Sequence, residues 1–118
     1  MKFNDLLEER FGPIECGSWC PNGWLALVLT TLEEARAIDK DLKVKQIKEK
    51  FGMLRLYVDS SHEEVKELIS LTEEWSMSVC QECGQTGSQY TRVEHRLRDG
   101  WYSTLCGAHE PTKRTDDK

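Results

Sequence analysis

The sequence predicts an α+β fold, in which a small helix/β-hairpin domain is followed by a C-terminal zinc ribbon or treble-clef-like module. Helical periodicity marks both ends of the first 78 residues, and strand-like alternation fills the stretch between them. Two pairs of metal-ligating residues flank a second turn signal near the C-terminus. We therefore expect the helix/hairpin domain over 1–78, a zinc-binding module over 79–110 and a polar, disordered tail over 111–118.

The N-terminal segment predicts a short helix that ends at Gly12-Pro13, because Gly suits the position after a helix and Pro forbids its continuation. Asn4 can cap this helix. The apolar residues that recur at helical spacing are Phe3, Leu7 and Phe11. The loop over 14–23 then contains Cys16 and Cys20, whose spacing is wider than that of a metal knuckle. These cysteines either line a second site or, as we favour, are buried as small apolar residues.

A wide apolar stripe at helical spacing predicts a helix over Trp24–Asp39, with Asn22 as its cap. In the alternative, Trp24–Thr30 is a buried strand, and Thr31 and Glu34 form the capping box of a helix that follows it. The length of the apolar pattern favours a helix throughout.

The segment 43–58 predicts a β-hairpin, because apolar and polar residues alternate and a break at Lys50–Gly52 divides the run into two strands. The residues expected on the buried face of the second strand are Leu54, Leu56 and Val58. The residues expected on its other face are Met53, Arg55 and Tyr57.

The next helix is predicted from a capping box formed by Ser61 and Glu64. We expect its buried stripe to be Val65, Leu68, Ile69, Thr72 and Trp75. Farther along the chain, 89–94 and 100–104 predict a second hairpin around Arg98-Asp99-Gly100, where Asp-Gly is a strong turn signal.

The C-terminal third contains a metal-ligand pattern. Cys80-Gln-Glu-Cys83 and Cys106-Gly-Ala-His109 each place two ligands with two residues between them, and 22 residues separate the pairs. Such pairs hold Zn²⁺ tetrahedrally from two tight turns, and Gly84 suits the turn after the first pair. Four protein ligands complete the coordination shell, so we expect a structural Zn²⁺ with no open catalytic position. His95 is the spare ligand if His109 lies too far away.

Catalytic constellations are missing from the sequence. It contains no Gly-rich phosphate loop, no Gly-x-Ser-x-Gly elbow and no His-Glu-x-x-His pair. Cys16 or Cys20 is a remote candidate for a nucleophile, but nothing beside either thiol indicates activation. We therefore expect a protein that is not an enzyme.

The chain carries a net charge of −5, but its centre is basic, with six basic and two acidic side chains in residues 40–57. This centre is either a contact surface or an internal complement to the acidic helices, and the second interpretation is favoured. As a contact surface it combines cations that neutralise phosphates with aromatic rings that stack on bases. The candidate binding residues are Lys43, Lys45, Lys48, Lys50, Arg55 and Tyr57, together with Trp19 in the preceding loop.

Several motifs along residues 14–109 point to one known family. They are Glu15-Cys-Gly, Gly23-Trp24, Gln46-Ile-Lys-Glu-Lys-Phe-Gly-Met-Leu-Arg-Leu-Tyr-Val58, Glu73-Glu74, Cys80-Gln-Glu-Cys-Gly84, Gly100-Trp101 and Thr104-Leu-Cys106. Together they resemble small uncharacterised proteins encoded by bacteriophages and prophages, whose centre reads Gln-Val-Lys-Glu-Lys-Phe-Gly-Gly-Leu-Arg-Phe-Tyr. The chain departs from that pattern by Met53, where a second Gly is usual, and by an insertion over 18–21.

The resemblance carries no activity, but it favours a role in contact with a host or defence component. We expect a zinc-binding accessory protein that acts by protein–protein interaction, for which inhibition of a bacterial defence or nuclease complex is one concrete form. The alternative is nucleic-acid binding by the basic hairpin, with Arg92, Arg96 and Arg98 as further cations. No apolar run reaches the length of a membrane span, and no signal-peptide pattern begins the chain. We therefore expect the protein to act in the cytoplasm of a bacterial host cell.

Overall fold

The computed structural model describes residues 3–88 and 92–110, and the predicted tail over 111–118 lies outside them. The fold is α+β, as predicted, with helices and two antiparallel hairpins. In order, the elements are α1 (Phe3–Phe11), η1 (Asn22–Trp24), α2 (Leu25–Ile38), β1 (Lys43–Lys50), β2 (Met53–Asp59), α3 (Glu63–Trp75), η2 (Ser76–Ser78), β3 (Val93–Arg98) and β4 (Trp101–Cys106). None of the helices in the described residues has the length and apolar character that a membrane crossing needs.

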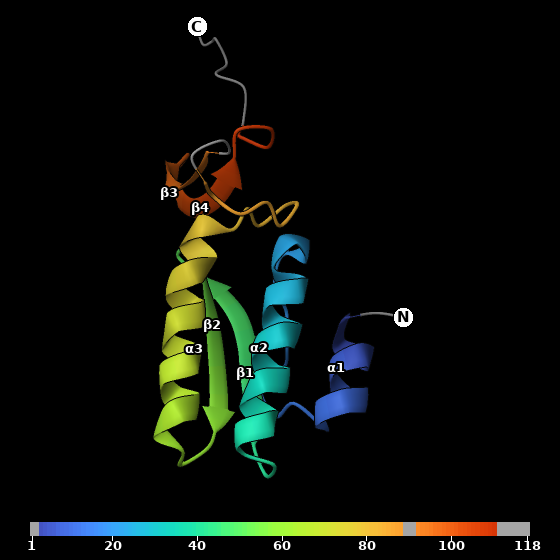
Figure 1. Cartoon of the computed structure of the whole chain (residues 1–118). Helices are drawn as coiled ribbons and strands as arrows, with labels where there is room; N and C mark the ends of the chain where they lie inside the picture. Colours follow the sequence, from blue (N-terminus) through green and yellow to red (C-terminus); the bar gives the residue numbers. More distant parts are fainter. Residues whose placement is uncertain (1–2, 89–91, 111–118) are drawn as a thin grey trace, which may run out of the picture.

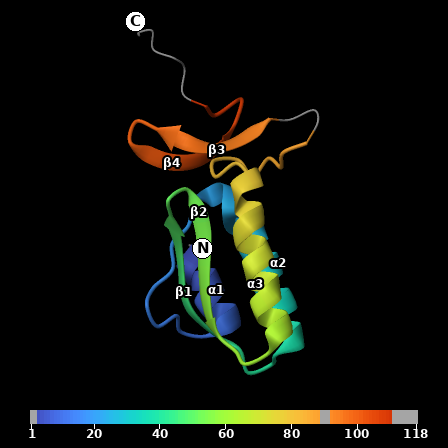
Figure 2. The same ribbon diagram turned by 90° about the vertical axis from the view of Figure 1, so that its left-hand side faces the viewer.

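The molecule has two layers and an end module. Helices α2 and α3 run side by side over one face of the β1–β2 hairpin, and α1 lies beside α2 (Figures 1 and 2). The β3–β4 hairpin lies beyond the C-terminal end of α3, across the end of both layers (Figure 2). The opposite face of the β1–β2 hairpin carries no helix among the described residues.

The main core lies between the helical layer and the β1–β2 hairpin. Its members are apolar side chains that leave water completely or almost completely, and each of the larger ones contributes about 1.5–3 kcal/mol by burial. The largest are Trp24, Leu7, Leu32, Leu42, Ile47 and Leu54. The helix periodicity that predicted α2 is confirmed, since Val28, Leu32 and Ala35 are all buried, and the alternative strand over Trp24–Thr30 is wrong.

The predicted helix caps are wrong. Asn4 lies inside α1, and Asn22 begins the short helix η1 instead of capping α2. The residue at the N-cap of α3 is His62, not Ser61, and it makes no capping bond with its side chain. Tertiary contacts explain the shift, because the hydroxyl of Ser60 accepts the N–H of His62 while it donates to Asp39 on the chain that follows α2.

The face alternation predicted for β2 is confirmed. Leu54 and Leu56 are buried against the helices, whereas Tyr57 is exposed. Strand β1 pairs with β2 in register from Lys50 opposite Met53, which leaves a two-residue turn, and the predicted second turn at Asp99-Gly100 has the same length. The part of the second hairpin that was expected over 89–91 lies outside the described residues.

Both edges of the β1–β2 hairpin are occupied. Along β1, the loop over 16–19 forms three backbone hydrogen bonds of 2.9 to 3.2 Å with the strand. Along β2, the hydroxyl of Ser76 accepts the N–H of Leu54 at 3.0 Å, and the carboxylate of Glu73 accepts the N–H of Leu56 at 2.8 Å. These backbone groups are thereby unavailable to an added strand.

One member of the predicted stripe of α3 is wrongly placed. Val65, Ile69 and Thr72 are buried, as predicted, and Leu68 is half-buried against the core, but Trp75 is 56 % exposed. The chain passes into η2 at this point, and the small Ser76, which is completely buried, takes the position against the sheet. Trp75 is therefore left on the outer side of the helical layer.

Hydrogen bonds to backbone carbonyls join the end module to the rest of the chain. The indole N–H of Trp24 donates to the carbonyl of Val79 at 2.8 Å, and the N–H of Gly23 donates to the carbonyl of Gln81 at 2.9 Å. The hydroxyl of Thr104 donates to the carbonyl of Gly52 at 2.8 Å. These contacts cross the boundary expected at residue 78, and the division into two domains stays a prediction.

We expect Gly23→Ala to destabilise the fold by about 2–3 kcal/mol, because a Cβ at this position would lie 2.2 Å from the carbonyl oxygen of Cys80, in backbone that cannot move aside. Gly107→Ala is the matched control, since a Cβ there meets no atom within 4 Å. Urea denaturation of both variants measures the difference. Equal stabilities would contradict the close backbone packing.

Candidate metal centre

Four side chains that can ligate a metal converge where the end module meets the helical layer. Cys80 and Cys83 come from the turn after η2, Cys106 ends β4, and His109 lies in the turn that follows. Their ligand atoms all lie within 4.8 Å of one another, and they form the only such group in the part of the chain that the structure describes. The two pairs singled out by their spacing are therefore brought together.

The local turns follow from the sequence of the knuckle. The N–H of Gly84 donates to the carbonyl of Cys80 at 2.8 Å, and Gly84 adopts a φ of 82°, the left-handed conformation predicted for it. The N–H of Cys80 donates to the carbonyl of Gln85 at 2.9 Å, which closes the turn from the other side. The second pair is closed in the same way by a bond of 3.1 Å from the N–H of His109 to the carbonyl of Cys106.

The distances between the donor atoms fit a tetrahedral ion. With a Zn–S bond of about 2.3 Å and a Zn–N bond of about 2.0–2.1 Å, the tetrahedron has S···S edges of about 3.8 Å and S···N edges of about 3.6 Å. The Sγ atoms of Cys83 and Cys106 are 3.8 Å apart. The Nδ1 atom of His109 lies 3.8 Å from Sγ of Cys80 and 3.3 Å from Sγ of Cys106. The four residues can thus hold one metal ion.

The environment of Cys106 favours the thiolate that binds metal. Hydrogen bonding from the His109 ring lowers the pKa of Cys106 to about 6, against the opposing effect of burial, with help from the Cys80 thiol and the backbone N–H groups of Ala108 and His109. Cys80 and Cys106 are buried, whereas Cys83 and His109 are exposed. The cluster therefore lies at the surface with one side covered by protein.

The spare ligand suggested by the sequence has another role. His95 shares a hydrogen bond of 3.0 Å with the hydroxyl of Thr104, and its ring stacks on Tyr102 with centroids 5.5 Å apart. It is not a member of the metal cluster. His95 is thus part of the packing of the β3–β4 hairpin.

The two N-terminal cysteines differ from each other. Cys20 is 5 % exposed and packs in the main core, where burial raises its pKa to about 12, so the prediction of a buried small residue is confirmed for it. Cys16 is exposed, and the same prediction is wrong for it. All five cysteines are free thiols.

The residues of the basic hairpin have different surroundings. Lys45 is paired with Glu15 at 2.6 Å, and this contact lowers the pKa of Glu15 and raises that of Lys45. Arg55 lies 3.9 Å from Glu73. Lys43 is exposed at the start of β1. The remaining candidates on this hairpin, Lys48, Lys50 and Tyr57, lie on its outer face. The backbone N–H of Trp19 in the neighbouring loop donates to the carbonyl of Ile47 on β1.

The arginines of the second hairpin converge on a carboxylate that the sequence did not single out. Glu110 lies within 3.4 Å of Arg92 and within 3.1 Å of both Arg96 and Arg98. Burial raises the pKa of Glu110, but the three guanidinium groups outweigh it, and the net shift is downward. These cations thus form an ion-pair cluster with Glu110 and Glu94 on the surface of the end module.

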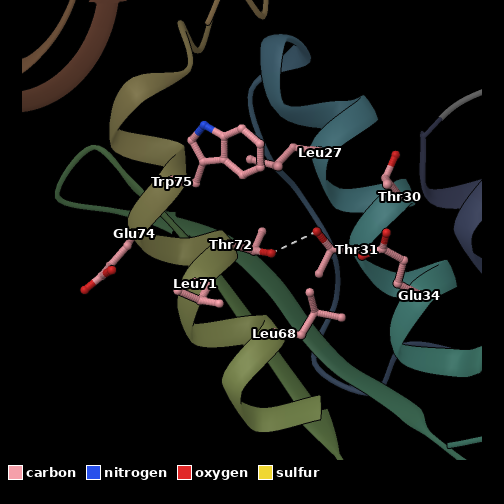
Figure 3. A pocket seen from close by; sticks show the side chains of 9 residues that line it. All are labelled: Leu27, Thr30, Thr31, Glu34, Leu68, Leu71, Thr72, Glu74 and Trp75. Carbon is pink, nitrogen blue, oxygen red and sulfur yellow. Dashed lines mark hydrogen bonds between the residues drawn. The ribbon is translucent and has the colours of Figure 1, made fainter. Parts of the chain in front are cut away.

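A groove between α2 and α3 was not predicted. This α2–α3 groove has a volume of about 560 Å³ and lies on the side of the helices that faces away from the sheet (Figure 3). Its apolar lining consists of Leu27, Leu68, Leu71 and Trp75. Thr31 and Thr72 share a hydrogen bond of 3.0 Å between the two helices (Figure 3). The feature of the sequence that could have indicated this groove is the apolar stripe of α3, because the stripe is wider than the part of the helix that the sheet can cover.

We expect the purified protein to contain one zinc ion per chain. His109→Ala should weaken the retention of the metal, whereas His95→Ala should leave metal retention unchanged. The reason is that only His109 belongs to the cluster. Elemental analysis of protein prepared without chelator measures the metal content of the wild type and of both variants. Circular dichroism after chelation reports unfolding of 79–109. A metal-free wild-type protein, or equal loss in both variants, would show that the cluster is not the metal site.

The thiols should differ in reactivity at pH 8. We expect Cys16 to be alkylated rapidly in the folded protein, and Cys20 to stay unmodified, because Cys20 is buried and its pKa of about 12 leaves little thiolate. Mass spectrometry after iodoacetamide treatment locates the modified residues, with urea-unfolded protein as the control for full reactivity. Equal labelling of both residues in the folded state would contradict the packing of Cys20.

Comparison of the chain with protein-family models, curated proteins and solved structures found no significant match. The resemblance to phage-encoded proteins therefore stays a prediction, and so does the absence of enzymatic activity. What the structure itself supports is a Cys₃His cluster with the dimensions of a metal centre.

Proposed function

We propose that this chain is a non-enzymatic, zinc-stabilised accessory protein of the phage-encoded kind, which acts in the bacterial cytoplasm by binding a host protein. Inhibition of a defence or nuclease complex is the concrete form that we favour. The observation that carries the proposal is the α2–α3 groove, where large apolar side chains are exposed in a concave surface. The resemblance of residues 14–109 to phage proteins supports the setting.

The metal has a structural role in this proposal. Three thiolates and one imidazole complete a tetrahedral shell, and this donor set is typical of structural Zn²⁺. No coordination position then remains for a substrate or an activated water. Zinc stabilises the β3–β4 hairpin, whose own small core contains only Leu105 and the cysteines Cys80 and Cys106 among its buried residues, with Val93 packed against it.

The groove has the features of a docking site for a helix. Leu71 is 64 % exposed and Trp75 is 56 % exposed, and both line the hollow beside Leu27 and Leu68. Exposed apolar side chains that gather in a concave surface usually mark a binding site. The hollow runs between two parallel ridges, the geometry in which an amphipathic helix inserts its apolar face.

The acidic residues beside the groove favour a partner helix of opposite charge. Glu34 from α2 and Glu74 from α3 lie on opposite sides of the groove (Figure 3), and 58–78, which includes α3, contains six acidic and one basic side chains. A partner helix with basic residues on its polar face would meet this acidic rim favourably, whereas an acidic helix would be repelled. The proposed occupant is thus a cationic amphipathic helix of the partner protein.

A second hollow adjoins the groove, and the two together form a longer surface along which a helix can bind. A neighbouring hollow of about 550 Å³ shares Leu27, Thr30 and Trp75 with it and extends to Cys83 and Gly84 of the metal knuckle. The combined surface runs from the middle of the helical layer to the metal centre. A helix bound along it would therefore contact both parts of the molecule.

We expect the double variant Leu71→Asp, Trp75→Glu to lose its partner in affinity purification from bacterial lysate, with recovery reduced at least tenfold, because buried carboxylates oppose apolar docking. Leu97→Asp is the matched control, since Leu97 is 55 % exposed on the β3–β4 hairpin. Quantitative mass spectrometry measures the recovered partner, and urea denaturation shows that all three chains are folded. No stoichiometric partner, or equal recovery with both variants, would refute the proposal.

A further inference from the structure

We infer that the outer face of the β1–β2 hairpin binds single-stranded nucleic acid by base stacking. This surface, which we call the outer face, consists of Lys48, Lys50, Phe51, Arg55, Tyr57 and Trp19. It is distinct from the α2–α3 groove, and the inference does not depend on the protein partner proposed above.

The strand register places the cations on one side of the hairpin. Lys48 is opposite Arg55, and Lys50 is opposite Met53, so these side chains share the face that points away from the helices. Tyr57 lies on the same face, opposite Gln46. The helices cover only the other face of the hairpin (Figure 2).

Three segments in or beside this hairpin each carry an exposed ring. Phe51 from the β1–β2 turn is 65 % exposed, Trp19 from the preceding loop is 62 % exposed, and Tyr57 from β2 is 43 % exposed. Lys48 Nζ lies 5.9 Å from the centroid of Tyr57, and Lys50 Nζ lies 5.6 Å from the centroid of Phe51. Cations and rings thus alternate, as in surfaces that track a phosphate backbone and stack its bases.

The backbone at Phe51 is a second, independent observation. Phe51 has a φ of 57°, in the left-handed region that a bulky L-residue rarely adopts. The two-residue turn with positive φ at both Phe51 and Gly52 normally contains Asn, Asp or Gly at its first position. The other hairpin of this chain obeys that preference, with Asp99 at a φ of 51°. Phe51 therefore costs stability in the free protein, where its ring stays mostly exposed.

The spacing of the rings suits more than one base. Tyr57 and Met53 are four residues apart on β2, about 13 Å along the strand. Phe51 lies beyond Met53 in the turn, and Trp19 lies beside Ile47 on the other strand, where its N–H donates to the Ile47 carbonyl. The rings are therefore spread over more than about 13 Å, a length that takes several nucleotides of an extended strand.

The charge distribution permits nucleic-acid binding at the outer face even though the protein as a whole is acidic. The excess of carboxylates lies in 1–39 and 58–78, the segments of the helical layer, whereas 40–57 contains six basic and two acidic side chains. The outer face therefore presents cations on the side away from the acidic helices. Because both edges of the hairpin are occupied, a ligand must bind on the face and not by adding a strand.

The test is Phe51→Asn, assayed by fluorescence anisotropy with a labelled ten-nucleotide oligo-dT or oligo-U at low salt. We expect roughly tenfold weaker binding, since the stack on one base is lost. The same variant should unfold at a higher urea concentration than the wild type, because Asn suits the left-handed turn. A gain of stability together with a loss of affinity cannot be explained by misfolding.

Two further variants locate the site. Lys48→Ala with Lys50→Ala should weaken binding and reduce its salt dependence. The groove variant Leu71→Asp, Trp75→Glu is the matched control and should bind like the wild type, because Leu71 and Trp75 line the α2–α3 groove on the side that faces away from the hairpin. Failure of one proposal is then separate from failure of the other.

The probes decide between ligand classes. We expect single strands to bind more tightly than a duplex of equal length or poly-glutamate, since only unpaired bases expose their faces for stacking. Equal binding of poly-glutamate would indicate an acidic protein ligand and overturn the inference. Unchanged affinity of Phe51→Asn, or no binding of any single strand at low salt, would overturn it as well.

Discussion

The position of the metal module depends on one close contact between backbones. Gly23 and Gly84 touch without side chains between them, the N–H of Gly23 bonds to the Gln81 carbonyl, and the buried Trp24 anchors the Val79 carbonyl through its indole N–H. A larger residue at Gly23 would separate the knuckle from the start of α2. The same contact explains why η1 precedes α2, since the chain must place Gly23 and Trp24 side by side against the knuckle before the helix can begin.

A second contact connects the module to the hairpin. Gly52 fits against the backbone of Tyr102 and Ser103, and its carbonyl accepts the hydroxyl of Thr104. The β1–β2 turn is therefore fixed from behind by the β3–β4 hairpin while Phe51 projects from it into water. A turn held in this way can tolerate a strained residue, because the Gly52 contacts stabilise the turn where the sequence of the turn itself does not.

Local patterns in the sequence predicted the elements, and tertiary contacts decided the details that were wrong. Amphipathic stripes and the two turns gave α2, α3 and both hairpins, and the ligand spacing gave the cluster of Cys80, Cys83, Cys106 and His109. The caps at Asn22 and Ser61 failed because η1 and the Ser60 hydroxyl occupy their places. Trp75 was assigned to the core because a helix stripe does not show which of its residues meets a neighbour. The α2–α3 groove has the same origin, because the apolar stripe of α3 is wider than its contact with the sheet. No short sequence motif marks this groove.

The Cys₃His cluster adjoins both proposed surfaces, so a metal ion held there would support binding without taking part in it. Cys83 and Gly84 line the hollow that continues the α2–α3 groove, while Thr104 holds the turn that carries Phe51. The helices lie on one side of the β1–β2 hairpin (Figure 2), so the α2–α3 groove and the outer face are separated, and the two proposed ligands would not compete for space. Loss of the metal would loosen one end of each surface at the same time, because the knuckle and the hairpin are joined by the same four ligands. A metal ion at this cluster would therefore support two faces that are otherwise independent, and occupancy of one face should leave the affinity of the other nearly unchanged.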